Sequence, residues 1–120
     1  MKPKIQDTEF GSITIGGAVF EHDVIIRLKG KVKRRKRKLS KRVYGTSHTL
    51  SLEEAKHVYR KGAARLIVGS GQTGMVTFSD EAADYFERKG CSVSLARTPT
   101  AIRAWNQAKG AVIGLFHLTC

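Results

Sequence analysis

The chain has 120 residues, the usual size of one domain, and its 41% hydrophobic content is enough for one packed core. No apolar run reaches the length of a membrane span, and the first residues show no signal-peptide or transit-peptide pattern. Two cysteines give no sign of a secreted disulfide framework or of a zinc site. We therefore expect a single cytoplasmic domain over residues 1–120, whose net charge of +12 favours polyanionic partners.

The chain begins with predicted β structure. Two short apolar runs, residues 13–15 and 18–20, flank a Gly-Gly pair that permits the positive φ angles of a tight hairpin. Residues 23–28 continue as a strand, and Gly30 can turn the chain into the next one.

That next strand enters a strongly basic segment, residues 29–42, which holds ten Lys or Arg and no acid. Outside these ten residues the chain has 12 Lys or Arg and 10 Asp or Glu, so it is nearly neutral there. Strand alternation leaves neither face of the segment with the apolar side chains that a core requires, so we expect a basic hairpin arm that projects into solvent. The arm is either a solvated element that discourages edge-to-edge pairing or a weak, sequence-independent phosphate contact without base stacking. The predicted contact residues are Lys31, Lys33, Arg34, Arg35, Lys36, Arg37 and Lys38.

Beyond the basic segment the apolar pattern changes from period two to period 3.6 and indicates three helices. Ser51 and Glu54 form a capping box for the first, Ser79 caps the second, and Thr98 starts the third. Strands that alternate with these helices are predicted at about 65–69, 91–96 and 111–116. The order predicts an α/β fold: a single domain whose mixed sheet has antiparallel N-terminal hairpins and parallel strands connected by helices.

The carboxyl ends of parallel strands meet at one edge of a sheet, where ligands commonly bind. Backbone N–H groups of a glycine loop, a helix N-terminus and an arginine at this edge would suit a small anion. The alternatives are a plain glycine turn between two strands, a threonine that only caps its helix, and a solvated arginine. The predicted anion or ligand pocket comprises Gly69, Ser70, Gly71, Gln72, Thr73, Gly74, Arg97, Thr98 and His117.

The glycines of this loop match the GxGxxG fingerprint of dinucleotide-binding domains, but the context does not. Residues 75–78 are predicted to be extended and the helix starts only at Ser79, so no cofactor is predicted. Neither His48 nor His117 belongs to a spaced ligand set, so no metal is predicted either. His117 and Cys120 lack an orienting third group for thiol chemistry. With no recognised catalytic constellation, the sequence does not predict an enzyme.

Taken together, the motifs FGSITIGG, HDVII, YGTSHTLS, LIVGSGQTG, AWNQ and HLTC resemble a known family of small domains over residues 10–120. This family includes the adipogenesis-associated domain proteins and the mitochondrial complex I assembly factor 3 proteins. The resemblance implies a three-layer α/β domain, no established enzymatic activity, and assembly or regulatory roles in the animal relatives. The chain's start shows no mitochondrial targeting pattern, and its basic run is not typical of organellar members. It therefore resembles a free-standing archaeal-type or bacterial-type member. The resemblance implies a cleft lined by some of Gly11, Gly16, Asp23, His48, Gly69, Gly71, Thr98, Asn106, His117 and Cys120.

Three functions fit the sequence. A non-enzymatic interaction or assembly-type protein with an unknown protein partner comes first, because of the family resemblance. The second is weak non-specific nucleic-acid binding through the basic arm, and the third is small-anion or ligand binding at the carboxyl edge of the parallel strands. No membrane partner is expected.

Overall fold

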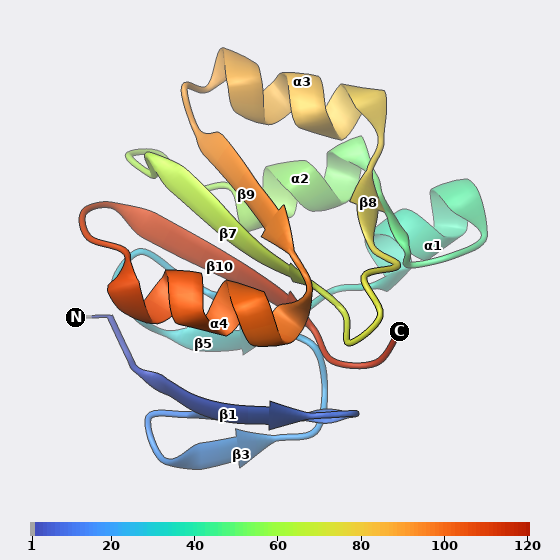
Figure 1. Cartoon of the computed structure of the whole chain (residues 1–120). Coiled ribbons are helices and arrows are strands. Elements are labelled where there is room, and N and C mark those ends of the chain that lie inside the picture. The colour runs from blue at the N-terminus through green and yellow to red at the C-terminus, as the bar shows by residue number, and fades with distance from the viewer. Residues whose placement is uncertain (1) are drawn as a thin grey trace.

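A five-stranded mixed sheet forms the centre of the computed structural model, which describes residues 2–120 (Figure 1). The strand order is β5-β4-β10-β7-β9. The parallel strands are β7 (Arg65–Ser70), β9 (Ser92–Ala96) and β10 (Val112–His117), whereas β4 (Val24–Ile26) and β5 (Val32–Arg34) form an antiparallel hairpin at one side. The predicted α/β class with parallel strands joined by helices is confirmed.

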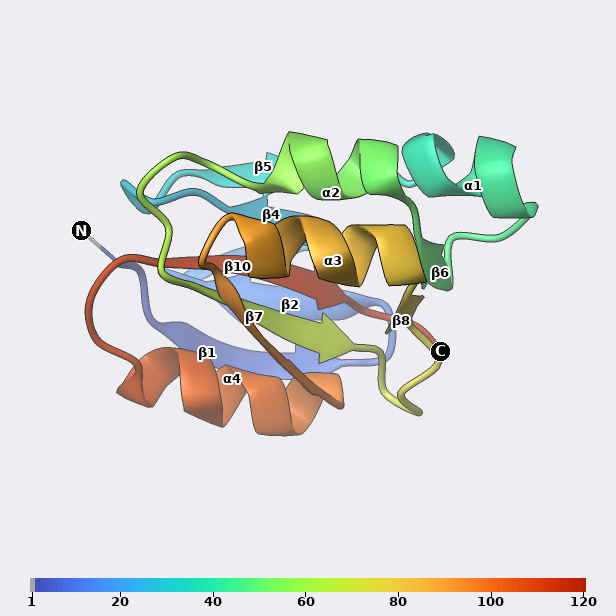
Figure 2. The same ribbon diagram turned by 90° about the horizontal axis from the view of Figure 1, so that it is seen from above.

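Alternating apolar residues fill both faces of this sheet and produce three layers. Leu66 and Val68 of β7 pack into a core with α2 (Leu52–Val58) and α3 (Asp80–Arg88), whereas Ile67 points to the opposite face. On that face lie α4 (Thr98–Gln107) and a second sheet, made of β1 (Ile5–Glu9), β2 (Ser12–Ile15) and β3 (Ala18–Phe20) (Figure 2). The central strands are thus buried on both sides, which is why they read as continuous apolar runs.

The N-terminal sheet contains the predicted hairpin. Gly16 and Gly17 have φ angles of 57° and 83°, values that glycine adopts without steric cost, and they join β2 to β3. Asn106 of α4 accepts a hydrogen bond from Ile5 N at 2.9 Å and donates one to Ile5 O at 2.8 Å. This side chain therefore fastens β1 to the helix beside it.

All three predicted helix starts are found, and two of them have the predicted serine cap. Ser51 Oγ accepts from Glu54 N, and Ser79 Oγ accepts from Ala82 N, each at 3.1 Å. Helix α4 does begin at Thr98, but the alternative that Thr98 caps this helix is wrong, because the N-cap position is Arg97, which makes no side-chain cap bond. Thr98 instead points inward and is fully buried.

The basic segment differs most from its prediction. Its first part does form the β4–β5 hairpin, but residues 38–44 form an additional helix, α1 (Lys38–Tyr44), which lies next to α2 (Figure 2). Two short strands, β6 (Thr49–Leu50) and β8 (Thr77–Phe78), pair in parallel beyond it. Strand β6 was not predicted, whereas β8 lies within residues 75–78, which were predicted to be extended. No helix among residues 2–120 is both long enough and apolar enough to cross a membrane.

Candidate functional site

Three strand ends bring polar side chains together at the end of the five-stranded sheet where its parallel strands finish. His117 is the last residue of β10, Asp23 immediately precedes β4, and Arg35 immediately follows β5. Because β4 runs antiparallel to β10, its start lies beside the end of β10, and β5 returns the chain to the same end of the sheet. The topology therefore places an acid, a base and a histidine at one point.

Arg35 is the centre of a buried ion cluster, although the residues on either side of it are exposed. Its Nε donates to Glu54 Oε2 at 2.6 Å and its Nη2 to Glu54 Oε1 at 3.2 Å, which is a bidentate arrangement. Its Nη1 donates to Asp23 Oδ2 at 3.0 Å, and Nη2 also donates to the carbonyl of Ser47 at 2.7 Å. The side chain is 0% exposed, so the prediction that Arg35 contacts phosphates in solvent is wrong: two buried carboxylates draw it inward.

The carboxylate of Glu54 binds Arg35 in this cluster and does not complete the predicted capping box. Ser40 Oγ donates to Glu54 Oε1 at 2.5 Å and accepts from Ser51 N at 2.9 Å. The hydrogen bond from Ser51 N, which a capping box assigns to the glutamate carboxylate, is therefore accepted by Ser40 on α1. This pair of bonds fixes α1 to the first turn of α2.

Asp23 connects the cluster to β10. Its Oδ2 lies 2.6 Å from His117 Nδ1, and its Oδ1 accepts from Leu118 N at 2.9 Å. Burial opposes ionisation of Asp23, but His117, the Leu118 N–H and Arg35 outweigh it, so the pKa of this carboxyl lies below its ordinary value. Burial likewise opposes the charge of Arg35, but Glu54 and Asp23 outweigh it and raise the pKa of the guanidinium. Both shifts favour the charged forms of Asp23 and Arg35 at neutral pH.

A positively charged cleft of about 440 Å³ adjoins the cluster. The ring of His48, in its wall, packs edge-on against His117 with the ring centres 5.5 Å apart. Burial, together with the charges of His117, Arg37 and Arg35, lowers the pKa of His48. Arg37, whose side chain is 53% exposed, donates to Ser47 Oγ at 3.2 Å and lies 3.9 Å from Asp23. The cleft is lined by Arg37, Lys38, Lys41, Gly45, Thr46, Ser47 and His48.

The other nine basic side chains of residues 29–42 are all exposed, and we call this set the basic face. Six of the seven predicted contact residues, all except Arg35, are exposed on it. Lys29, Lys41 and Arg42 are also exposed, and Arg42 pairs with Glu53 of α2. The members of the basic face are Lys29, Lys31, Lys33, Arg34, Lys36, Arg37, Lys38, Lys41 and Arg42.

The glycine loop, residues 69–74, lies at the same end of the sheet, together with the other residues of the predicted anion pocket. Thr98 Oγ1 accepts from Gly71 N at 3.0 Å and donates to His117 O at 2.6 Å, and the side chain of Arg97 lies against Gly74. The structure thus brings the predicted residues together.

The closing residues of the chain cover this loop. Gln72 N donates to Thr119 O at 2.7 Å, and Thr73 N and Met75 N donate to Cys120 O at 3.3 and 3.0 Å. The N–H groups that would form an anion nest therefore already have partners, and the anion pocket stays a prediction. Among residues 2–120, no group of three or more His, Cys, Asp or Glu side chains is placed to hold a metal ion.

The sequence analysis missed Arg35, Glu54 and Ser40 as members of one site. A signal for Glu54 was present, because it lies one helical turn before Val58 and beside Ala55, on the buried stripe of its helix. A buried carboxylate requires a partner of opposite charge. The identity of that partner could not be read from ten adjacent basic residues.

Comparison with known proteins agrees with this architecture. A family model described as a protein of unknown function (DUF498/DUF598) matches residues 5–114. The chain belongs to this family. The membership confirms the family resemblance of the sequence motifs. No curated protein matched the chain.

Solved structures of hypothetical proteins share the fold. A conserved hypothetical protein from Pyrococcus horikoshii is 31% identical, with a TM-score of 0.88 over 98% of this chain and 99% of that one. The structure of MT938 is 29% identical, with a TM-score of 0.82 over 99% of this chain and 100% of that one. A Mth938-like domain from Bordetella pertussis, at 15% identity, has a TM-score of 0.64 over 97% of this chain and 85% of that one, and supports the fold alone.

Proposed function

We propose that this protein is a cytoplasmic, non-enzymatic binding protein whose basic face takes a nucleic acid through its phosphates. The observation that carries the proposal is the buried position of Arg35 among nine exposed Lys and Arg. Arg35 joins the end of β5 to Glu54 and Asp23, so its neighbours extend from a fixed surface instead of a mobile arm. A preorganised cationic surface loses less conformational freedom on binding than a mobile one.

The charge balance of the basic face supports a polyanionic partner. Its ten-base segment contains no acid, and Asp23 and Glu54 beneath it are buried and paired with Arg35. The exposed acid Glu53 pairs with Arg42 at its border. The remainder of the chain is nearly neutral, so the excess positive charge of the molecule belongs to this segment. Such an excess of positive charge attracts phosphates whatever the base sequence.

The cleft beside His48 gives this surface one concave phosphate position. Arg37, Lys38 and Lys41 place positive charge on its wall, and Thr46 and Ser47 place hydroxyl groups there. The segment 29–42 contains no aromatic residue on which bases could stack. We therefore expect backbone recognition, with non-specific dissociation constants of about 10⁻⁴ to 10⁻⁶ M at physiological salt.

The test is a titration of random-sequence duplex DNA and RNA with the native protein at several salt concentrations. We expect a variant with Arg34, Lys36, Lys38 and Lys41 changed to Ser to bind more weakly and to show a shallower salt dependence. Each lost phosphate contact should reduce the slope of log affinity against log salt by about 0.9. Arg35 stays unchanged, so the buried cluster that shapes the surface is preserved.

The matched control changes Lys4, Lys89, Arg103 and Lys109 to Ser, which removes four charges from exposed positions outside the basic face. Equal weakening by both variants would show that only net charge matters and would contradict a specific basic face. Absence of binding by the native protein at low salt would reject a nucleic-acid partner and favour the protein partner that the family resemblance implies.

A further inference from the structure

The central sheet has an uncovered edge at β9, far from the basic face. β9 pairs with β7 on one side only, and its sequence SVSLA contains no charged residue and no proline. Its register with β7 is continuous, so no bulge turns it away from solvent. Natural proteins protect edge strands with charges, prolines or bulges, and β9 has none of these.

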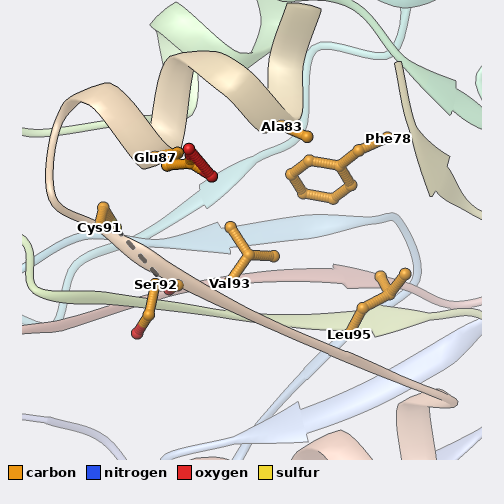
Figure 3. A pocket seen from close by; sticks show the side chains of 7 residues that line it. All are labelled: Phe78, Ala83, Glu87, Cys91, Ser92, Val93 and Leu95. Atoms are coloured by element: carbon orange, nitrogen blue, oxygen red, sulfur yellow. Dashed lines mark hydrogen bonds between the residues drawn. The ribbon is translucent and has the colours of Figure 1, made fainter. Parts of the chain in front are cut away.

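An apolar groove runs beside this edge, between β9 and α3 (Figure 3). Val93 and Leu95 of β9 point into it from below, while Ala83 and Glu87 of α3 lie above them. The two β9 side chains are 37% and 46% exposed, and the groove has a volume of about 360 Å³. Phe78 lines its far end.

The free backbone groups of β9 can be assigned from its pairing with β7. Ser92 N donates to Ala64 O, on the chain that leads into β7, so the backbone groups of Ser92 face inward. Alternation along a strand then turns the N–H and C=O groups of Val93 and Leu95 outward. The same two residues that present apolar side chains to the groove also present unpaired backbone groups to solvent.

We propose that β9 is a self-association edge, on which the β9 strand of a second copy of this chain docks antiparallel about a two-fold axis through Ser94. In this register Val93 of each copy faces Leu95 of the other, and each of the two pairs exchanges two backbone hydrogen bonds. In a two-fold arrangement the same strand of each copy forms the interface, so the outward backbone groups of β9 are paired in both copies. The two five-stranded sheets become one continuous sheet.

Charge favours a second copy over a basic or acidic peptide as the occupant. The edge strand itself is uncharged, and the basic face lies at the opposite edge of the sheet, beyond β5, so two copies bring their strongest positive charges to the far ends of the dimer. The register also places Arg97 of one copy opposite Cys91 of the other, near Glu87 on α3. Within residues 2–120 neither Glu87 nor Arg97 has an ion-pair partner, and the dimer supplies one to each.

Sedimentation equilibrium over a wide range of protein concentrations tests the proposal. We expect the native protein to reach the mass of a dimer, and we expect Leu95→Lys to remain a monomer because it places a charge in the paired edge. Met75→Lys is the matched control, since Met75 is a similarly exposed apolar residue (52%) outside β9 and receives the same charge. Circular dichroism confirms that both variants fold. A monomeric native protein, or a dimer that survives Leu95→Lys, would overturn the proposal.

Disulfide trapping tests the register itself, in a Cys120→Ser background that removes the exposed native thiol. Ser94 faces itself across the axis in a non-hydrogen-bonded pair, where Cα atoms lie about 4.5 Å apart, within the range that a disulfide spans. Ser94→Cys should therefore form a covalent dimer on mild oxidation. Ser92→Cys, which faces Ala96 of the other copy, should not. Equal cross-linking of the two variants would show that this register is wrong.

Discussion

The two edges of the central sheet carry opposite chemistry. At one edge, β5 presents Lys33 and Arg34 and is followed by further basic residues. At the other edge, β9 presents serine, valine and leucine without a single charge. Both edges expose unpaired backbone groups, yet only the first is protected against another strand. From this difference we expect the side chains of an edge strand to decide which kind of partner it admits, which is phosphates at β5 and a second strand at β9 under the two proposals made above.

The edges also differ in how they are held. β5 is a short strand whose end is fixed by the ion cluster around Arg35, and its own side chains are mostly exposed. β9 pairs along its whole length with the buried strand β7. The position of the charged edge strand β5 therefore depends on a few polar side chains, whereas the position of the uncharged edge strand β9 depends on backbone pairing with β7.

The largest expected effect comes from removing the charge that anchors the β5 edge. Arg35→Met leaves the carboxylates of Asp23 and Glu54 buried without their main partner, and we expect a loss of about 3–5 kcal/mol in the free energy of unfolding. Urea denaturation measures this loss. Arg34→Met, at the exposed neighbouring position, should change stability by less than about 0.5 kcal/mol. Similar values for the two variants would mean that the cluster does not anchor β5.

A smaller effect is expected from acid, through Asp23. The pKa of Asp23 is lower in the folded protein than in the unfolded chain, so its ionised form stabilises the fold. This contribution is complete above the ordinary pKa of 3.8 and disappears as the pH falls through the lower folded value. We therefore expect the native protein to lose stability below pH 3.8.

Urea titrations at a series of pH values measure this dependence. Asp23→Asn should be less stable at neutral pH and should lose less stability on acidification, because its side chain does not titrate. Asp7→Asn, at an exposed position of β1, provides the matched control and should follow the native curve more closely. An acid response of Asp23→Asn identical to that of the native protein would contradict the role of this carboxylate.

Much of the fold followed from local patterns. The central strands β7 and β10 are apolar runs, and the starts of α2 and α3 carry Ser51 and Ser79 with acids in the first turn. Helix α1 could not be found in this way, because its first turn has no acid and no side-chain cap. It is held by Ser40, whose partner Glu54 lies on another helix.

The position of the site in the fold could be predicted from the sequence, but the residues that form it could not. Its position at the carboxyl ends of the parallel strands follows from topology, and His117 was expected there. Arg35 was not, because its burial depends on two acids that are distant in sequence, and strand alternation gave it the same surroundings as Lys31 and Lys33. A buried ion pair between distant segments leaves little trace in either segment alone.

The smallest expected effect concerns the like charges on the β5 edge. The charge of Lys31, two residues before Lys33 on the same segment, lowers the pKa of Lys33, as repulsion between two nearby ammonium groups would. Lys33→Thr removes this repulsion and places a residue with higher β propensity in the strand, so we expect a slight rise in Tm at low salt. Differential scanning calorimetry at low and high salt separates the two causes, because β propensity does not depend on salt. At 1 M salt the screening length is about 3 Å, so the part of the rise that comes from repulsion should vanish. A rise in Tm that is equal at both salt concentrations would show that repulsion contributes nothing, and the charged edge would then be maintained at no measurable cost in stability.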